Sequence, residues 1–421
     1  MRVALFSPLP PAPTGVADYS RLLLQGLSER FPVEAYTDQP IEPTLVPCYS
    51  WREFEKRQSI EPRALPVYQM GNSLHHDFMY PLVFRHPGVL VLHDLVLHHS
   101  RLAMYMKSPE VVDYVTDLGS REKRDRALDK LSEYAAEVEA SYPGQGDAIA
   151  EIAIRMGGGR LFYQYPLHEL LVRASKMTLV HNRAAREELE ARCPEAAIRV
   201  VRMGIEIPEG VPRDEARRRL GLGKEIILAS FGLVTPEKRI SIALRCLKMM
   251  LDDGVDARYL VIGGTVSHYD ARREAQQLGV AERVHFTERV SETDFHLYAS
   301  AADICLNLRY PSAGETSATL LRLLAAGRAV MVTDQMRELD YPDTVVARTS
   351  LDGDEDGLFC DVMDLLRDLD RRRKLERGAR EYVEAEHSPD SMLDDYAACL
   401  AEAQELPSPS VKLPLHLSRP A

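Results

Sequence analysis

The sequence predicts an α/β protein built from two doubly wound domains that face each other across a cleft. Through most of the 421 residues, apolar runs of strand length alternate with segments whose apolar residues have helical spacing. Residues 205–225, which are rich in proline, glycine and charge, interrupt this alternation, and afterwards it starts again. The chain is 45% hydrophobic and 28% charged, as is usual for a globular protein, and its length suits two or three domains.

The first domain is predicted to cover residues 1–205. Its first apolar run, residues 2–7 (RVALFS), is followed by a loop with proline and glycine and then by a segment with helical spacing. Further strand-like runs begin near residues 66, 88, 177 and 197. Residues 101–170 are predicted to be a helical insertion of mixed charge, which either covers a site or is a solvated helical pair.

The second domain is predicted to cover residues 206–386. Its strand-like runs are IILASFG, ARYLVIGG, RVHFTERV, ADICLNLR and AVMVTD, and helical segments lie between most of them. Residues 387–406 are expected to form a last helix capped near Ser388. The tail, residues 407–421, is rich in proline and serine and is predicted to be disordered.

Charge and cysteine usage argue against several classes of protein. A net charge of −12 disfavours a nucleic-acid binder, which needs a basic surface, although a local basic patch facing a membrane or a phosphate remains open. The six cysteines form no CxxC pair, which is typical of reduced thiols in a cytosolic protein. The N-terminal apolar run is too short for a signal peptide, and no run is long enough to span a membrane. We therefore predict a cytoplasmic protein.

The loop after the first strand contains Thr14, Gly15 and Val16 directly before a helix. A glycine at this place lets main-chain N–H groups approach an anion, and the helix N-terminus adds partial positive charge. The dinucleotide fingerprint GxGxxG is absent, so a plain turn is the alternative interpretation.

Histidines follow two of the predicted strands. His93 and Asp94 end one apolar run, and His75 and His76 follow another. A histidine at a strand end can exchange hydrogen bonds with a sugar hydroxyl or a leaving-group oxygen, whereas the alternative is a core or capping histidine. Several neighbouring histidines also suggest a metal, but no HExxH spacing is present, and we expect no metal.

Two further stretches combine a glycine turn with the start of a predicted helix. Gly232 precedes Lys238 and Arg239, which would lie in a first helical turn where the macrodipole disfavours cations, so an anionic partner such as phosphate is indicated. The alternative for these two residues is a solvated basic pair.

The second of these stretches is SAGETSATLL, which contains Gly314, Glu315, Thr316 and Ser317. Its helix start suits a phosphate, whereas the Glu315 carboxylate suits sugar hydroxyls or, alternatively, a helix cap. Together these stretches predict a site for a sugar nucleotide.

The same motifs, in the same order, resemble those of a known family. TGVADYS, VLHD, VHN at residues 180–182, FGLVTPEK and YPSAGETSATLLRLLAAG are similar to the motifs of GT-B glycosyltransferases of the retaining family 4. The resemblance implies two Rossmann-like domains and a final helix that returns to the first. It also implies metal-free transfer of a sugar from a nucleotide-sugar, held by the second domain, to a saccharide or lipid-linked hydroxyl acceptor, held by the first. Glycan, glycolipid or polysaccharide synthesis at the inner membrane face would be the setting.

The resemblance also assigns roles to single residues. It places His93 next to the donor sugar, Gly15 near the diphosphate and Lys238 on the diphosphate. Glu315 matches the first Glu of the family's donor motif, and Val290 matches a loop that holds the base through its backbone. We therefore predict three catalytic residues: His93, Glu315 and Lys238. The predicted donor-binding residues are Gly15, Gly232, Lys238, Arg239, Val290, Gly314, Glu315, Thr316 and Ser317. The predicted acceptor-side residues are Asp94, His75 and His76.

Two departures from the family pattern leave alternatives open. Gly232–Leu233 stands where the family usually has Gly-Arg, so the arginine that contacts the diphosphate in the family is missing here. Arg239 is the candidate to replace it. The family's second Glu falls on Leu323 or, with one residue deleted, on Arg322. A non-catalytic partner subunit of the same fold and a sugar-nucleotide epimerase are therefore alternatives to a transferase.

Overall fold

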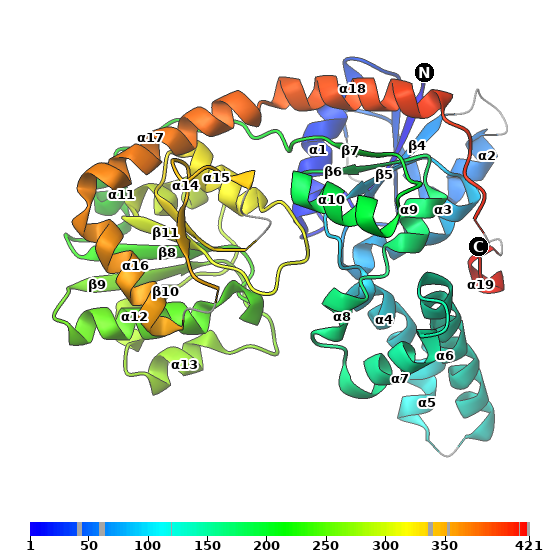
Figure 1. Ribbon diagram of the computed structural model, residues 1–421, viewed down its shortest axis with the longest axis horizontal. Coiled ribbons are helices and arrows are strands. Elements are labelled where there is room, and N and C mark those ends of the chain that lie inside the picture. The colour runs from blue at the N-terminus through cyan, green and yellow to red at the C-terminus, as the bar shows by residue number, and fades with distance from the viewer. Residues whose placement is uncertain are drawn as a thin grey trace. The chain divides into compact units, whose positions relative to one another are not determined.

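The structure, a computed structural model, describes residues 1–39, 44–58, 64–118, 120–335, 340–351, 354–411 and 413–418. The chain divides into two compact units (Figure 1). The first unit comprises Met1–Arg202, Ala313–Thr316 and Leu393–Ala421, and the second comprises Met203–Ser312 and Ser317–Met392. Each unit is built on one parallel sheet, which confirms the predicted α/β class.

The sheet of the first unit has the order β3-β2-β1-β4-β5-β6-β7, and all its strands are parallel. Its strands are β1 (Val3–Phe6), β2 (Val33–Thr37), β3 (Cys48–Ser50), β4 (Leu65–Met70), β5 (Val89–Leu92), β6 (Met177–Val180) and β7 (Ile198–Val200). The central strands β1, β4, β5 and β6 are buried along their whole length, as expected for a sheet covered on both faces. The sequence analysis found these four and β7 but missed β2 and β3.

Helices cover the sheet of the first unit. They are α1 (Gly15–Ser28), α2 (Phe54–Gln58), α3 (Tyr80–Arg85), α9 (Glu169–Ala174), α10 (Arg183–Arg192) and the Leu393–Glu405 part of α18 (Pro389–Glu405), with the 3-10 turns η1 (Trp51–Glu53) and η2 (Leu74–Met79). On α1, Gly26 leaves room for Leu393 of α18, because a Cβ at Gly26 would clash with that side chain. Tyr19 and Tyr396 join the same two helices by a hydrogen bond of 2.8 Å between their hydroxyls.

The helical insertion has its own small core. It consists of α4 (His98–Met106), α5 (Pro109–Thr116), α6 (Arg121–Ser141), α7 (Gly146–Met156) and α8 (Leu161–Gln164). Apolar residues of α4, α6, α7 and α8 form this core. Inside it, Arg101 donates to both carboxylate oxygens of Glu137, at 2.8 and 2.7 Å, and neither side chain is more than 2% exposed.

The tail differs from the expectation of disorder. Residues 413–418 include a short helix, α19 (Leu415–Ser418), in which Leu417 is buried. The ring Nε2 of His416 lies 3.1 Å from the hydroxyl of Tyr105 in the insertion. An apolar contact and a hydrogen bond that are distant in sequence therefore order a segment whose composition alone indicates disorder; residues 412 and 419–421 lie outside the described residues.

The sheet of the second unit has the order β10-β9-β8-β11-β12-β13, and it too is parallel throughout. Its strands are β8 (Ile226–Phe231), β9 (Ala257–Ile262), β10 (Val284–Phe286), β11 (Ile304–Asn307), β12 (Val330–Thr333) and β13 (Ala347–Thr349). Its helices are α11 (Arg213–Leu220), α12 (Ile240–Asp252), α13 (Ala271–Gln277), α14 (Glu292–Ala301), α15 (Ala318–Ala325), α16 (Glu355–Arg367) and α17 (Leu369–Glu386), with the 3-10 turns η3 (Pro236–Lys238) and η4 (Ala281–Arg283). Figure 1 shows α12 and α13 on one side of this sheet and α14 and α15 on the other.

The residue patterns account for these elements. On α12, Ile240, Ala243, Leu244 and Leu247 recur with helical spacing and are all buried, so the helix covers the sheet with one apolar face. The boundary between the units falls after Arg202, and α18 is divided between them after Met392. Among the described residues, no helix is long and apolar enough to cross a membrane.

Candidate functional site

In each unit the loops that follow the strands gather at one edge of the sheet, because all the strands run parallel. In the second unit Gly232 follows β8, Val290 lies between β10 and α14, and Arg309 follows β11. Ser317 caps the N-terminus of α15 at the same edge. The chain therefore brings most of the predicted donor-binding residues of this unit to one place.

Lys238 and Thr319 converge on the bare Cα of Gly232. The amine of Lys238 donates to the carbonyl of Phe231 at 3.1 Å. A Cβ built on Gly232 would lie 3.0 Å from Lys238 Nζ and 3.5 Å from Thr319 Oγ1, and the φ of +95° at Gly232 also favours glycine. This group of three residues, called the lysine cradle below, presents an amine, a hydroxyl and open backbone together.

The amine of the lysine cradle has no acidic partner in the part of the chain that the structure describes. Among the described residues Lys238 forms no ion pair, and Arg309 lies near enough to oppose its charge. Burial and, secondarily, Arg309 lower the pKa of Lys238 to about 7. A partly buried cation without a nearby counter-charge is stabilised when an anion binds, so the lysine cradle suits a phosphate group.

Arg239 differs from the prediction for it. The predicted first helical turn is a 3-10 turn that ends at Lys238, and α12 begins only at Ile240. Arg239 lies between them with a left-handed φ of 53°, and its Nη1 is 3.5 Å from Thr333 Oγ1. Its guanidinium therefore lies at the end of β12, at the same edge of the sheet as the lysine cradle.

We predict that Gly232→Ala destabilises the protein by about 1 kcal/mol, because alanine disfavours positive φ. It should also weaken nucleotide binding at least about tenfold, because the new methyl group displaces the amine of Lys238. Gly254→Ala is the matched control, since Gly254 has a φ of +78° and nothing within 4 Å of its Cβ position. Thermal unfolding and calorimetric titration with nucleotides would measure both effects. Equal nucleotide affinities in the two variants would refute the cradle.

The hydroxyl of Ser317 is engaged in hydrogen bonds within the second unit. Its hydroxyl accepts from the main-chain N–H of Leu320 at 3.2 Å and lies 3.4 Å from Asn307 Oδ1. Ser317 is therefore the cap of α15, and Thr319, two residues onward, supplies the hydroxyl of the lysine cradle.

No acid stands where the family resemblance expects a second one. Leu323 is fully buried in the core of the second unit. Arg322 donates to Glu292 at 3.0 Å, and its guanidinium lies 3.9 Å from the centre of the Phe295 ring. Both candidate positions therefore have structural roles.

In the first unit, Gly15 begins α1 and is exposed, with no atom within 4 Å of its Cβ position. The hydroxyl of Thr14 caps the helix by accepting from Ala17 N–H at 3.1 Å. The backbone at Gly15 is thus exposed, and its contact with the donor stays a prediction.

Both ring nitrogens of His93 have hydrogen-bond partners inside the first unit. Its Nε2 lies 2.8 Å from Gln69 Oε1, and its Nδ1 lies 3.2 Å from His181 Nε2. The residue is only 9% exposed, and burial holds the pKa of its imidazole well below the usual range. Both ring nitrogens are therefore engaged within the first unit, and the catalytic role of His93 stays a prediction.

Asp94 and His76 come together at the ends of β5 and β4. Asp94 Oδ2 accepts from the main-chain N–H of Asn72 at 2.9 Å, and both Asp94 and His76 border the Cβ position of Gly71. His76 is buried, and its pKa is lowered to about 4 by burial. His75 is half-buried in η2 and acts electrostatically on Asp38 after β2.

The segment Ala313–Thr316, which carries Glu315, belongs to the first unit. Leu95 N–H donates to Ala313 O at 2.6 Å. The side-chain amide of Asn182 donates to Gly314 O at 3.2 Å and to Thr316 Oγ1 at 3.0 Å. Glu315 itself is half-buried between these anchored neighbours. Sequence reasoning noted VHN at residues 180–182 but assigned no role to His181 or Asn182; the signal was their position at the end of a strand.

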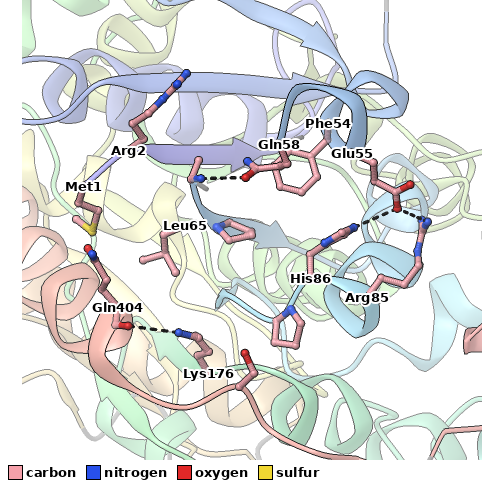
Figure 2. Close-up of a pocket in the computed structure, with 14 residues that line it drawn as sticks. Met1, Arg2, Phe54, Glu55, Gln58, Leu65, Arg85, His86, Lys176 and Gln404 are labelled. Atoms are coloured by element: carbon pink, nitrogen blue, oxygen red, sulfur yellow. Dashed lines mark hydrogen bonds and ion pairs between the residues drawn. The ribbon is translucent and has the colours of Figure 1, made fainter. Parts of the chain in front are cut away.

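A cavity of about 690 Å³ lies elsewhere, at the amino-terminal edge of the first sheet (Figure 2). Its charged groups already have protein partners. Glu55 pairs with Arg85 at 2.5 Å and with His86 at 3.1 Å, and Lys176 Nζ donates to the carbonyls of Ala403 and Gln404. The lysine cradle, with its unpaired amine, is therefore the better candidate for an anionic ligand.

Comparisons with known proteins agree with the predicted fold. Residues 225–368 match the family described as glycosyl transferases group 1. The sequence has no match among curated proteins. Within the described residues, no three His, Cys, Asp or Glu side chains are grouped as metal ligands.

Solved structures resemble the whole chain. Sucrose-phosphate synthase from Thermosynechococcus elongatus is 15% identical, with a TM-score of 0.66 over 96% of this chain and 98% of that one. HepE from Anabaena, solved in complex with UDP-glucose, is 13% identical, with a TM-score of 0.64 over 96% and 100% of the two chains. A glycosyltransferase from Rickettsia africae is 10% identical, with a TM-score of 0.57 over 96% and 98%. At these identities the likeness shows the fold, which is the two-domain GT-B fold.

Proposed function

We propose that the chain, whose residues 225–368 match the glycosyl transferases group 1 family, moves a sugar from a nucleoside-diphosphate donor to a hydroxyl acceptor with retained configuration. The observation that carries this proposal is the lysine cradle: a partly buried amine that has no acidic partner among the described residues, beside a hydroxyl and a glycine turn, at the carboxyl edge of a parallel sheet. Such a site suits a diphosphate.

The proposed roles follow from what each group can donate or accept. In the second unit, Lys238, Arg239 and Thr319 would bind the donor phosphates. The backbone around Val290, before the cap of α14, would contact the base. In the first unit, Glu315 would accept hydrogen bonds from sugar hydroxyls, and the N–H groups at Gly15 would bind an anionic or hydroxyl group. Asp94 and His76 would lie on the side of the acceptor, a saccharide or a lipid-linked sugar.

Chemically, the bond between the anomeric carbon and the diphosphate oxygen breaks, and a bond to the acceptor oxygen forms. Negative charge develops on the departing phosphate, and the ammonium of Lys238 stabilises it there. The acceptor proton passes to that phosphate oxygen, so the step is balanced without a metal, which we propose is not required. A role in glycan or polysaccharide synthesis, with or without contact at a membrane surface, is part of the same proposal.

The proposal is tested by incubating the full chain with UDP-, GDP- and ADP-sugars and following thermal stability and release of the nucleotide. A donor at about 100 times its Kd should stabilise the protein by about 2.7 kcal/mol, which raises the melting temperature by several degrees. Slow release of free sugar, or transfer to an added saccharide, would identify the donor. Failure of every donor and nucleotide to stabilise the protein would refute the proposal.

The loss of an acid at residues 322 and 323 favours one alternative, a non-catalytic partner subunit, because the family's second carboxylate is missing there. A partner subunit would neither release nor transfer sugar, even if it bound a nucleotide. An epimerase would convert the donor sugar without any acceptor, which product analysis with donor alone would reveal.

Nucleotide binding at about pH 8 is expected to take up a proton. The free amine of Lys238, with a pKa of about 7, is then mostly neutral. A bound diphosphate favours the ammonium and raises this pKa, so affinity should fall as the pH rises above about 7. Calorimetric titration in buffers of different ionisation enthalpy measures the uptake. A binding enthalpy that does not depend on the buffer would rule out this role of Lys238.

A further inference from the structure

We propose that Gln69 and His181 are positioning residues for sugar transfer, which hold the ring of His93 as the neutral tautomer with its proton on Nδ1. They do so within a chain of hydrogen bonds that runs from Gln69 through His93 and His181 to the Val201 carbonyl after β7. The proposal rests on the proposed function for its effect on turnover, whereas the tautomer itself can be tested without any substrate.

The Val201 end of this series of hydrogen bonds decides which group donates in each of them. The carbonyl of Val201 can only accept, so the Nδ1 of His181, 2.8 Å away, must carry a proton and donate. Burial lowers the pKa of His181 to about 4, so the ring is neutral and its Nε2 bears a lone pair. The ring nitrogen that faces this lone pair at 3.2 Å is Nδ1 of His93, which must therefore be the donor.

The hydrogen bond between His93 and Gln69 accounts for an amide nitrogen of Gln69 that is buried without a partner among the described residues. Neutral His93 with its proton on Nδ1 presents a lone pair at Nε2, so Gln69 must donate to it. With the amide oxygen of Gln69 facing His93 at 2.8 Å, Gln69 Nε2 is left buried without a hydrogen-bond partner among the described residues. The reversed amide, which has the same shape, puts that nitrogen on His93 and turns the oxygen toward Tyr396.

The opposite direction is costly. If His93 donated from Nε2 to Gln69, its Nδ1 would have to accept from His181, which would then need protons on both nitrogens. That imidazolium would be 4% exposed. Among the described residues, the titratable groups acting on the two rings are each other and His76, with the Tyr19 ring packed edge-on. None of these groups is a carboxylate that could stabilise the charge.

The held ring acts through the backbone. The main-chain N–H of His93 donates to Met70 O at 2.9 Å, and Asp94 holds the N–H of Asn72. The turn continues to Leu95, whose N–H donates to Ala313 O in the segment that carries Glu315. Fixing the His93 ring therefore fixes the turn that supports both Asp94 and this segment.

Nitrogen-15 NMR of the full chain with labelled histidine tests the tautomer directly. We expect His93 to show a protonated Nδ1 and an unprotonated Nε2 from about pH 6 to 8. A protonated Nε2 would overturn the proposal, whether or not the protein transfers sugar. If the tautomer is as proposed and no donor is turned over, the proposed function fails while the hydrogen-bond chain stands.

Variants test the positioning role. Gln69→Glu replaces the donor by an acceptor, so we expect His93 to gain a second proton and kcat to fall at least about tenfold and become dependent on pH, with KM little changed. His181→Gln keeps an acceptor for His93 Nδ1 and should retain more activity than His181→Leu. Wild-type NMR signals and turnover in Gln69→Glu, or equal turnover in the two His181 variants, would contradict the positioning role.

Discussion

Replacing Lys238 by alanine is expected to lower the rate of sugar transfer by about 10²- to 10³-fold, which is the usual loss when one electrostatic contact to a developing charge is removed. The amine is the only group of the lysine cradle that can carry a full charge, and it lies 3.0 Å from the Cβ position of Gly232. The melting temperature should stay the same or rise, because the folded protein no longer buries an amine whose pKa burial has lowered.

The matched control is Lys248→Ala on α12. Lys248 is exposed and pairs with Asp252 one turn away, at 2.8 Å, so its loss should change stability by at most about 0.5 kcal/mol and leave transfer unchanged. Initial rates and nucleotide affinities of both variants would be measured with the donor found in the screen. If Lys238→Ala transfers sugar at a rate within about twofold of the wild-type rate, the lysine cradle is not the diphosphate site.

The strands that sequence reasoning found are those whose signal is local. VALF of β1 and MTLV of β6 are apolar throughout because both faces of their sheet are covered. In contrast, β2 contains Glu34, whose carboxylate is held by Arg2 at 2.6 Å and by Arg57 at 3.0 Å. Those partners come from distant parts of the chain, so the residues VEAYT alone do not indicate a buried strand. The other two missed strands, β3 and β13, have only three residues each.

In the candidate site, too, sequence reasoning could find what depends on neighbouring residues but not what depends on distant ones. Lys238 was predictable because a glycine turn, a strand end and a cation stand within a few residues of each other. The choice between Ser317 and Thr319 was not, because it depends on which hydroxyl caps α15. The role of His93 depends on His181, which is 88 residues away. A pattern can place a histidine at a strand end, but only the packed fold shows whether its nitrogens are free.

Replacing Glu315 by glutamine is expected to lower kcat/KM by at least about 10²-fold without unfolding the protein. The main chain on both sides of Glu315 is anchored, since Asn182 donates to Gly314 O and to Thr316 Oγ1. The direction of the side chain is therefore largely set before substrate binds. A carboxylate can accept from two sugar hydroxyls, whereas the amide of glutamine offers one acceptor and turns a donor toward the second hydroxyl.

Two further variants separate this role from a structural one. Glu315→Asp keeps both acceptors on a side chain one methylene shorter, so it should retain more transfer than Glu315→Gln. Glu187→Gln, at an exposed position of α10, is the matched control and should behave as the wild type. Because the segment is held by main-chain and Asn182 contacts, all three variants should melt within a few degrees of the wild type. Near-normal kcat/KM in Glu315→Gln would show that sugar hydroxyls are bound by other residues.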